Sequence, residues 1–422
     1  MRLVEKHIVN KNSPLYGECD SICFKSKNLY NYANYIIRQE FIKTSKEKQE
    51  GIRENANYLN YYDINKLLVS EKQFDMYQLP IKVSNQTLMV LDKNWKAFFA
   101  SVRDYKKNPA KYKGRPKLPN YLDKENGRFV AIYEKGAISQ KQLKHGIIAL
   151  SKTNIQITSK KENILMVRIV PRLDHYVIEV IYKIPDVCKL EDNGRYLSLD
   201  LGINNLATIT SNVRDIKPMI VNGKPLKSTN QYYNKQIAEY KSVLEKRNKN
   251  KHSKRTRRIT NKRTRKIDDY LHKASKVIVD IAKDKQVNAI IIGKNGGWKQ
   301  STDMSKVSNQ NFVNIPHSRF ISMITYKCEK EGICVILQEE SYTSKASFLN
   351  LDPIPVYGKI ETEPEFSGYR KSRGCYKIKG GDRVINADVN GSYNILRKAI
   401  PNAFADGIEG LSVNPAIIKI AN

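Results

Sequence analysis

Cysteine and tryptophan are scarce in this chain of 422 residues, which contains 6 Cys and 2 Trp. No two cysteines form a CxxC pair, and this argues against a disulfide scaffold and against a cysteine-rich zinc site. The nearest pair, Cys19 and Cys23, is spaced as CxxxC, which fits either a metal or redox pair or, more simply, two ordinary thiols. The cysteine usage therefore favours a reducing, cytoplasmic setting.

Long apolar runs are also missing. The longest, such as Ile290–Ile292 with its neighbours, fall far short of the roughly 18 residues that span a bilayer. The first residues, Met1–Lys6, lack the apolar segment of a signal peptide. With 40% hydrophobic and 27% charged residues, the sequence predicts a globular chain of several domains and no membrane partner.

Negative charge is the third scarcity. The chain has 42 Asp and Glu against 74 Lys and Arg, so its formal net charge is +32. Nucleic acid is the first candidate partner for such an excess, because basic side chains displace the counterions condensed on phosphates.

The positive charge is clustered. Twelve of the 21 residues in Lys246–Lys266 are Lys or Arg and none is acidic, while Arg103–Lys117 has a single acid, Asp104. Tyrosines such as Tyr105 and Tyr112 are interleaved with the second cluster, as in surfaces that stack on bases. A solvated charged face is the alternative interpretation. The density and single sign of both clusters favour contact with nucleic acid.

The first half of the chain changes character twice. Residues 1–10 have the pattern of a strand, residues 20–105 carry apolar side chains at helical spacing, and residues 128–190 alternate with the period of strands. This order predicts a small antiparallel barrel or sheet that the N-terminal strand completes, with a helical unit inserted into it.

The second half has the element order of a ribonuclease H-like domain. Three short strands over 196–222 precede two helices that flank the basic stretch, and strands at 287–292 and 333–337 alternate with further helices, the last near 389–399. Three meandering strands followed by alternating helices and strands predict a mixed sheet covered by helices. The fold class is thus multidomain, combining α/β and α+β parts.

Two acids stand where a metal-dependent nuclease of this class needs them. Asp200 ends an otherwise apolar strand, where a carboxylate is costly unless it binds a metal or a partner. Asp388 lies at the expected start of the last helix, where a helix-capping acid is the alternative. Two-metal hydrolysis of phosphodiesters needs three or four carboxylates, and oxygen ligands suit Mg²⁺ or Mn²⁺.

The third acid is not at the end of the strand 287–292, where Gly293 stands instead. The next strand runs into Glu339 and Glu340. Because neighbouring parallel strands end at the same edge of a sheet, we expect Glu340, or else Glu339, to supply the third carboxylate. Two solvent-facing acids are the alternative.

Several motifs resemble those of the TnpB family of transposon-associated RNA-guided nucleases, which are related to Fanzor proteins and type V CRISPR effectors. Ser198–Thr208 (SLDLGINNLAT) resembles the first RuvC motif, Tyr342–Lys345 (YTSK) the YTSQ or YTSK segment, and Asn386–Leu396 (NADVNGSYNIL) the third RuvC motif. Pro109–Pro116 (PAKYKGRP) is similar to another typical segment. The likeness keeps motif order over nearly the whole chain.

The resemblance implies an RNA-guided DNA endonuclease of bacterial or archaeal origin with two Mg²⁺ or Mn²⁺ ions held by Asp200, Glu340 and Asp388. Its partners would be a guide RNA from the transposon end and double-stranded DNA beside a short motif. It further implies a wedge β-barrel over 1–20 and 119–190, a helical recognition domain over 21–118, and a RuvC domain over 191–340 and 387–422. The remaining segment, 341–386, would load target nucleic acid. The basic residues that we expect to contact nucleic acid are Lys111, Lys113, Arg115, Lys254, Arg255, Arg257, Arg258, Lys262, Arg263, Arg265, Lys345, Arg370 and Arg373.

The sequence departs from the family pattern at two places, and these departures are the reason to consider functions other than a nuclease. The second-motif glutamate is Gly293, and the four-cysteine zinc ribbon is missing, with Ser347 and Asn350 at the first cysteine pair and only Cys375 near the second. We therefore expect no zinc. The departures also motivate a second hypothesis, a nuclease-dead RNA-guided DNA-binding repressor, and a third, a general RNA-binding protein. Retention of both Asp200 and Asp388 argues for the nuclease.

Overall fold

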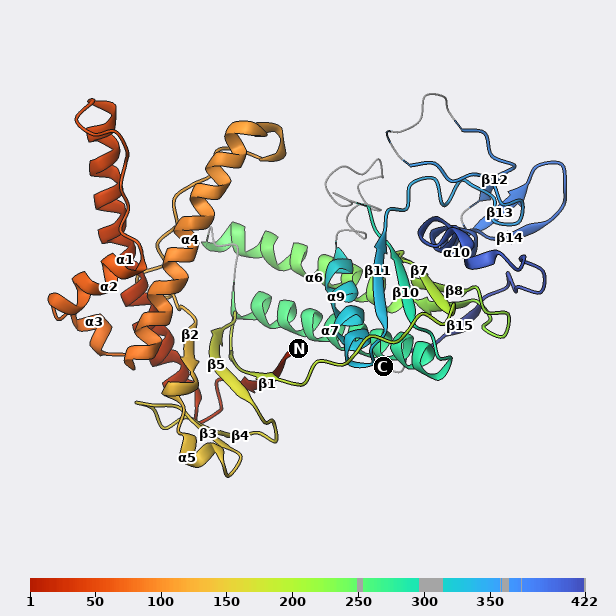
Figure 1. Ribbon diagram of the computed structural model, residues 1–422. Helices are drawn as coiled ribbons and strands as arrows, with labels where there is room; N and C mark the ends of the chain where they lie inside the picture. Colours follow the sequence, from red (N-terminus) through yellow and green to blue (C-terminus); the bar gives the residue numbers. More distant parts are fainter. Residues whose placement is uncertain (249–252, 296–313, 357, 359–363, 373, 421–422) are drawn as a thin grey trace. The chain divides into compact units, whose positions relative to one another are not determined.

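The computed structural model describes residues 1–248, 253–295, 314–356, 358, 364–372 and 374–420. The chain forms two compact units, Met1–Pro185 and Asp186–Asn422, and each is described by itself (Figure 1). Within the described residues, no helix combines the length and the apolar character needed to cross a membrane.

The first unit contains a four-stranded antiparallel sheet. Its strands, in spatial order, are β1 (Arg2–Val9), β6 (Tyr176–Lys183), β5 (Ile164–Pro171) and β2 (Ala131–Glu134). β1 pairs with β6 over its whole length, from Arg2 opposite Lys183 to Val9 opposite Tyr176. The N-terminal strand thus joins the later strands, as the sequence predicted. A separate hairpin, β3 (Ile147–Ala149) and β4 (Gln156–Thr158), follows α5 (Gln140–Leu143). The pairings give a sheet and a hairpin, so the closed barrel stays a prediction.

Four helices lie between β1 and β2 in the sequence. They are α1 (Tyr16–Gln49), α2 (Tyr61–Ser70), α3 (Phe74–Tyr77) and α4 (Ile81–Lys107), with a short 3₁₀ turn at Pro109–Lys111, and a second such turn, Lys135–Ala137, follows β2. α2 begins with a capping box, because Asn60 and Asp63 exchange side-chain and backbone hydrogen bonds. In α4 the fully buried Leu88, Leu91 and Trp95 share one face, as the helical spacing predicted.

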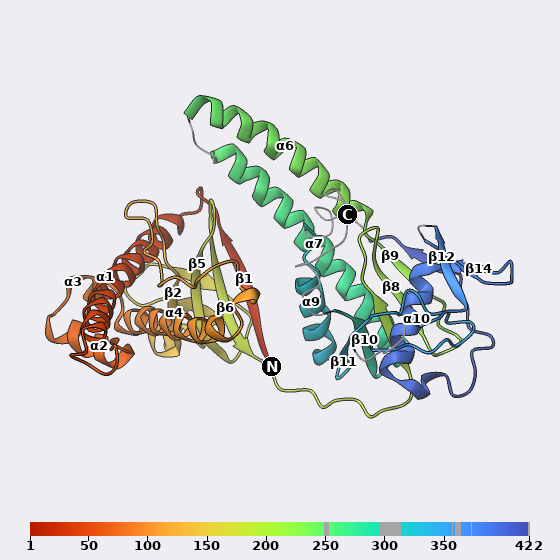
Figure 2. The same cartoon turned by 90° about the horizontal axis from the view of Figure 1, so that it is seen from above.

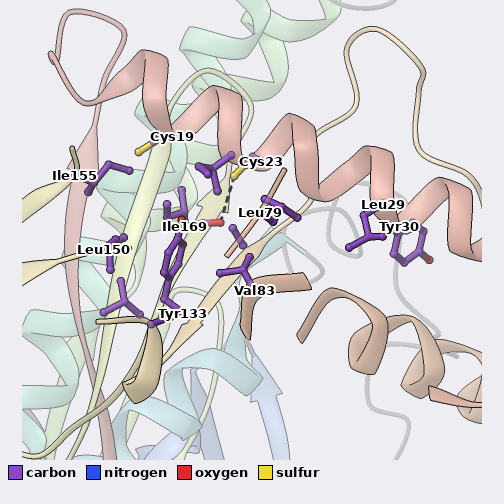
Figure 3. Packing of buried hydrophobic residues seen from close by; sticks show 14 of the residues in the cluster. Cys19, Cys23, Leu29, Tyr30, Leu79, Val83, Tyr133, Leu150, Ile155 and Ile169 are labelled. Carbon is purple, nitrogen blue, oxygen red and sulfur yellow. Dashed lines mark hydrogen bonds between the residues drawn. The ribbon is translucent and has the colours of Figure 1, made fainter. Parts of the chain in front are cut away.

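The helices and the sheet of this unit share one hydrophobic core. Trp95 is fully buried and its indole N–H donates to Asn34 Oδ1 at 3.1 Å, which joins α4 to α1. Cys19 and Cys23 are also buried here, and the Cys23 thiol donates to the carbonyl oxygen of Ile169 at 3.5 Å (Figure 3). Both cysteines are free thiols, and burial raises the pKa of Cys19 to about 12. Their role is packing, which is the simpler of the two interpretations of the CxxxC pair.

The second unit is built on a six-stranded mixed sheet. Its strand order is β11 (Cys334–Gln338), β10 (Ala289–Gly293), β7 (Tyr196–Asp200), β8 (Asn205–Ser211), β9 (Met219–Asn222) and β15 (Ala416–Ile418). β7, β8 and β9 form the predicted antiparallel meander, and β10 and β11 run parallel to β7. The edge strand β15, parallel to β9, was not predicted.

Helices cover both faces of this sheet. Leu197, Leu199, Ile290 and Ile292 pack with α7 (Lys254–Asp284) and α9 (His317–Lys330), whereas Tyr196 and Ile291 pack with α10 (Ala387–Ala399). The alternation of side chains along β7 and β10 separates the two cores. A 3₁₀ turn, Pro401–Phe404, follows α10.

Two features extend from the sheet. α6 (Lys224–Asn248) and α7 lie side by side as a long hairpin whose connected ends reach beyond the strands (Figure 2). Between β11 and α10, three antiparallel strands form a small sheet: β12 (Gly368–Ser372), β13 (Cys375–Ile378) and β14 (Val384–Asn386).

Candidate active site

Asp200 ends β7 on the face of the sheet that α10 covers. Leu197 and Leu199 point into the opposite core, so alternation places Ser198 and Asp200 toward α10. The Ser198 hydroxyl donates to the carbonyl oxygen of Ser392 at 2.6 Å. The close fit extends to Gly391, where an added Cβ would lie 2.9 Å from Asp200 Oδ2. The strand end and the helix are therefore in direct contact around Asp200.

Asp388 lies in the first turn of α10. Asn386 caps this helix, since its side-chain oxygen accepts from the backbone N–H groups of Asp388 and Val389. The Asp388 carboxylate is thus left for other partners: Oδ2 accepts from the Asn205 amide at 2.7 Å, and Oδ1 pairs with the Arg370 guanidinium at 3.3 Å. Asn205 follows Asp200 in the first motif, but nothing in the local pattern of residues predicts this bond.

Gly293 and Glu340 meet at the carboxyl ends of the next two strands. Ile292 of β10 is level with Leu199 of β7, so Gly293 stands level with Asp200. A Cβ added at Gly293 would lie 2.5 Å from Glu340 Oε2 and 2.6 Å from Ile395 Cδ1. Both distances are far below van der Waals contact. The Glu340 carboxylate therefore occupies space that a side chain at residue 293 would need.

Glu339 has a different environment from its neighbour. Its carboxylate forms an ion pair of 2.5 Å with Lys398, whose side chain is only 5% exposed. The same ammonium donates to the carbonyl oxygens of Ser341 and Pro355, at 2.9 and 3.1 Å. Lys398 therefore fixes the end of β11 to α10. Glu340 is held separately, since its backbone N–H donates to Asn295 Oδ1 at 2.9 Å. The two glutamates diverge, as alternation predicted.

The carboxyl groups influence one another electrostatically. Burial raises the pKa of Asp200 well above its usual value, and the charges of Glu340 and Asp388 raise it further, while Arg370 opposes them. Burial also raises the pKa of Glu340 to about 7, with a further contribution from Glu339. At Glu339, hydrogen bonds from Lys398 and Ser341 outweigh burial and lower the pKa. Clustered acids with raised pKa values are typical of functional sites.

The donor chemistry of this cluster fits a hard divalent cation. All the candidate ligands are carboxylate oxygens, which Mg²⁺ and Mn²⁺ prefer, and added positive charge would relieve the crowding that raises the pKa of Asp200. Among the described residues, no group of three or more His, Cys, Asp or Glu side chains is arranged to hold a metal ion jointly. In a two-metal site the carboxylates are shared between two ions roughly 3.5–4 Å apart, so three acids need not surround one ion.

Asparagines of α10 hold the segment that follows Glu340. Asn390 bridges Phe348 N–H and the carbonyl oxygen of Ala346, at 2.9 and 2.8 Å. Asn394 donates to the carbonyl oxygens of Thr343 and Ala346, at 2.9 and 2.7 Å. Asn390 and Asn394 of the third motif are therefore positioning residues, because they hold the backbone of the segment that follows Glu340. Their spacing of four along a helix is the only signal in the sequence that pointed to a shared face.

The carboxylate of Asp352 joins Ser347 to Ser367 through hydrogen bonds. Both residues lie in the segment where a zinc ribbon would be expected from the resemblance to the TnpB family. Asp352 is 7% exposed and accepts from the backbone N–H of Ser347 at 2.8 Å and from the Ser367 hydroxyl at 2.6 Å. The Ser347 hydroxyl also donates to Asn350 Oδ1 at 3.2 Å. Residues at the first cysteine-pair position thus bond to one another. The absence of zinc remains a prediction.

The basic residues singled out from the sequence have varied environments. Six in α7 are exposed: Lys254, Arg255, Arg257, Arg258, Lys262 and Arg265. Arg263 is instead half-buried, and its guanidinium donates to Asn230 Oδ1 and to the carbonyl oxygen of Asn314, at 2.8 and 3.0 Å. Its partners are therefore internal.

The remaining basic residues lie outside α7. Lys111 pairs with Asp104 at 2.7 Å, whereas Lys113, Arg115 and Lys345 are exposed. Arg373 lies outside the described residues.

Two protein families match parts of the chain. Residues 179–299 match the family described as a probable transposase, OrfB_IS605, and residues 317–395 match the Cas12f1-like TNB domain. No curated protein sequence matches the chain.

Solved structures that resemble the chain do so distantly. A Cas12f1–sgRNA–target DNA complex has 14% identity and a TM-score of 0.36, covering 93% of this chain and 98% of that one. C2c1 of Alicyclobacillus acidoterrestris with single-guide RNA has 8% identity and a TM-score of 0.39, covering 91% and 70%. Neither TM-score is high enough to bear on function. The two family matches, which together contain Asp200, Glu340 and Asp388, fit a protein of the TnpB family.

Proposed function

We propose that this chain is a transposon-associated, RNA-guided DNA endonuclease whose RuvC-type, RNase H-like site hydrolyses phosphodiester bonds. The observation that supports the proposal is the pKa of Asp200, which burial raises and the charges of Glu340 and Asp388 raise further, at a strand end that packs against α10. The net charge of +32 supports nucleic acid as the substrate and the guide.

Asp200, Asp388 and Glu340 would hold a pair of Mg²⁺ or Mn²⁺ ions. When bound, such ions supply an activated water and stabilise the charge on the leaving oxygen. Both Glu340 and Asp388 perturb Asp200, so all three acids would share the pair of ions. Arg370, which pairs with Asp388 at 3.3 Å, would neutralise a phosphate of the strand being cut.

The domain assignment accompanies this proposal. We assign 1–20 and 119–190 to a wedge domain, 21–118 to a helical recognition domain, and 191–340 with 387–422 to the nuclease domain. The segment 341–386 would then load target DNA. The guide RNA from the transposon end and a short motif beside the target follow from membership of the family alone.

The test is cleavage by the ribonucleoprotein purified with its own RNA. Matched target DNA and Mg²⁺ should give product strands, and Asp200→Ala should abolish them while target binding persists. Cleavage that survives Asp200→Ala would overturn the proposal. Tight target binding by the unaltered protein without any product strand would select the nuclease-dead repressor, and binding that ignores the guide sequence would select a general RNA-binding protein.

A further inference from the structure

A hollow of about 420 Å³ lies beside the carboxylate cluster, in the segment between β11 and α10. Its aromatic lining consists of Tyr342, Phe366 and Tyr369, and its charged lining of Lys345, Lys379 and Glu365. The volume is within the range of small-ligand sites in proteins. An aromatic lining with two ammonium groups and one acid suits a flat, anionic ligand.

The hollow adjoins the candidate active site along two chain segments. Tyr342 follows Glu340 by two residues, and the turn between them is closed by the Thr343 hydroxyl, which donates to the Glu340 carbonyl oxygen at 2.8 Å. On the other side, Tyr369 is the neighbour in β12 of Arg370, whose guanidinium pairs with Asp388 at 3.3 Å, and alternation turns the two side chains to opposite faces of the strand. Short chain segments thus link the hollow to the carboxylates, two residues from Glu340 to Tyr342 and one from Arg370 to Tyr369, so a nucleotide next to the one being cut is the occupant we consider.

The three rings lie outside the buried core: Tyr342 and Phe366 are half-buried and Tyr369 is exposed. Tyr342 and Phe366 have ring centroids 6.3 Å apart at an interplanar angle of 36°, and Tyr369 is 47% exposed. Tyr342 has a φ of 65°, in the left-handed region that favours glycine. A tyrosine in this strained conformation, with its ring lining a hollow, points to a use for the ring beyond core packing.

The base of the hollow is rigid. A Cβ added at Gly368 would lie 2.5 Å from the ring of Tyr376, so this ring packs directly against the backbone of β12. The fully buried Tyr376 also donates its hydroxyl proton to the carbonyl oxygen of Lys345 at 2.8 Å. Both sides of the hollow are thus fixed to one buried ring.

We propose that this hollow is a stacking subsite for an unpaired base of the DNA strand that enters the active site. The aromatic faces would stack on the base, and Lys345 and Lys379 would contact the flanking phosphates. The base must be unpaired, because the faces of paired bases are stacked within a duplex. This inference rests on the proposed function and adds to it a defined contact with single-stranded DNA.

The test is binding of single-stranded DNA by the ribonucleoprotein carrying Asp200→Ala, so that no cleavage intervenes. The oligonucleotide carries 2-aminopurine, whose fluorescence falls on stacking, and a second oligonucleotide has an abasic site at the same position. Phe366→Leu combined with Tyr369→Leu keeps apolar bulk but removes two flat faces. We expect about tenfold weaker binding of the base-containing strand, the scale of a single base stacked on an aromatic ring, and a loss of quenching.

The controls separate stacking from folding. Phe366→Tyr and Tyr369→Phe should restore both signals, and Phe74→Ala, which removes a ring that is 70% exposed in the first unit, should change neither. The abasic strand should bind the leucine variant and the parent equally. Equal losses for both strands, unchanged quenching, or weakened retention of the guide RNA alone would overturn the subsite. If the leucine variant loses the quenching as expected while the unaltered protein never cleaves its target, only the proposed nuclease activity is overturned.

Discussion

The nuclease proposal depends most on Glu340. The glutamate that the TnpB family usually has in its second motif is replaced by Gly293 in this chain, so Glu340 has to supply the third carboxylate. Glu340→Gln keeps the size of the side chain but removes its charge, so we expect target cleavage to fall by about 10²-fold or more. Glu339→Gln is the matched control, since its carboxylate pairs with Lys398. Gel-based cleavage assays at equal target occupancy provide the measurement, and a larger loss with Glu339→Gln would reverse the assignment.

The raised pKa of Glu340 has a consequence for stability. Its pKa is about 7 in the folded chain against an ordinary value of 4.5, so the folded state binds the proton more tightly. Tighter proton binding by Glu340 adds to the free energy of unfolding. This contribution is fully present below pH 4.5 and is lost as the pH rises to 7. In Mg²⁺-free buffer at pH 8, Glu340→Gln should therefore raise the melting temperature by about 2–4 °C or more, the shift that 1 kcal/mol gives.

Scanning calorimetry at two pH values checks this expectation. At pH 4.5 the difference between Glu340→Gln and the unaltered chain should largely disappear, because the glutamic acid is then protonated in the folded state. With Mg²⁺ added at pH 8, the unaltered chain should have the higher melting temperature of the two, since the cation stabilises the carboxylate of Glu340 but not the amide of the variant. A melting temperature of Glu340→Gln that is lower than that of the unaltered chain in metal-free buffer would contradict the crowding described here.

At the scale of elements, α10 organises the site because it packs against β7, β8, β10 and the segment after β11. Lys398, near its C-terminal end, donates hydrogen bonds to residues 339, 341 and 355. Lys398→Met keeps the aliphatic stem but leaves these acceptors unsatisfied. We expect a decrease of about 1–3 kcal/mol in unfolding free energy and weaker cleavage, because the segment before Glu340 is no longer fixed.

A double-mutant cycle distinguishes positioning from general destabilisation. Glu339→Gln should cost less in the background of Lys398→Met than alone, since the ion pair is already broken. Chemical denaturation and terbium luminescence, which reports on carboxylate sites without cleavage, provide the two measurements. Additive effects on both would show that Lys398 does not act through the strand end.

The sequence predicted elements better than their connections. Periodicity identified the meander of β7, β8 and β9 and the strands β10 and β11, because apolar runs and alternation are local signals. It missed β15, whose three residues pair with β9 only through the tertiary fold. Asp200 was singled out as a charge in an apolar strand and Asp388 by its place at the start of the last helix, and their role as metal ligands stays a prediction. Asn205 and Lys398 escaped notice, since their partners are distant in sequence.

At the scale of the whole molecule, the exposed basic face of α7 predicts a salt-dependent interaction with nucleic acid. Arg257, Arg258 and Arg265 are all exposed. Changing all three to Gln should lower the slope of log affinity against log salt by about 0.7–0.9 for each phosphate that these arginines neutralise. Fluorescence anisotropy over a series of salt concentrations, with RNA and with duplex DNA, shows which nucleic acid this face binds.

The matched control lies on the same helix. Lys273 and Lys276 pair with Asp269 and Asp280, each at 2.9 Å, so their replacement by Gln removes the same kind of charge from ion-paired positions. This variant should leave the salt slope nearly unchanged. An equal effect for each charge removed, three in the first variant and two in the control, would mean that overall charge, and not the face of α7, determines binding.

The close approach of Glu340 to Gly293 limits how such a site can change over generations. A single codon change that introduced glutamate at 293 would force two carboxylates into room for one, beside Ile395. The atoms in the way are the ends of two side chains, so Glu340 and Ile395 would have to move to accommodate a second acid. Gly293 therefore suits a site whose acid comes from residue 340, and Gly293→Glu in the presence of Glu340 should displace one of the two carboxylates.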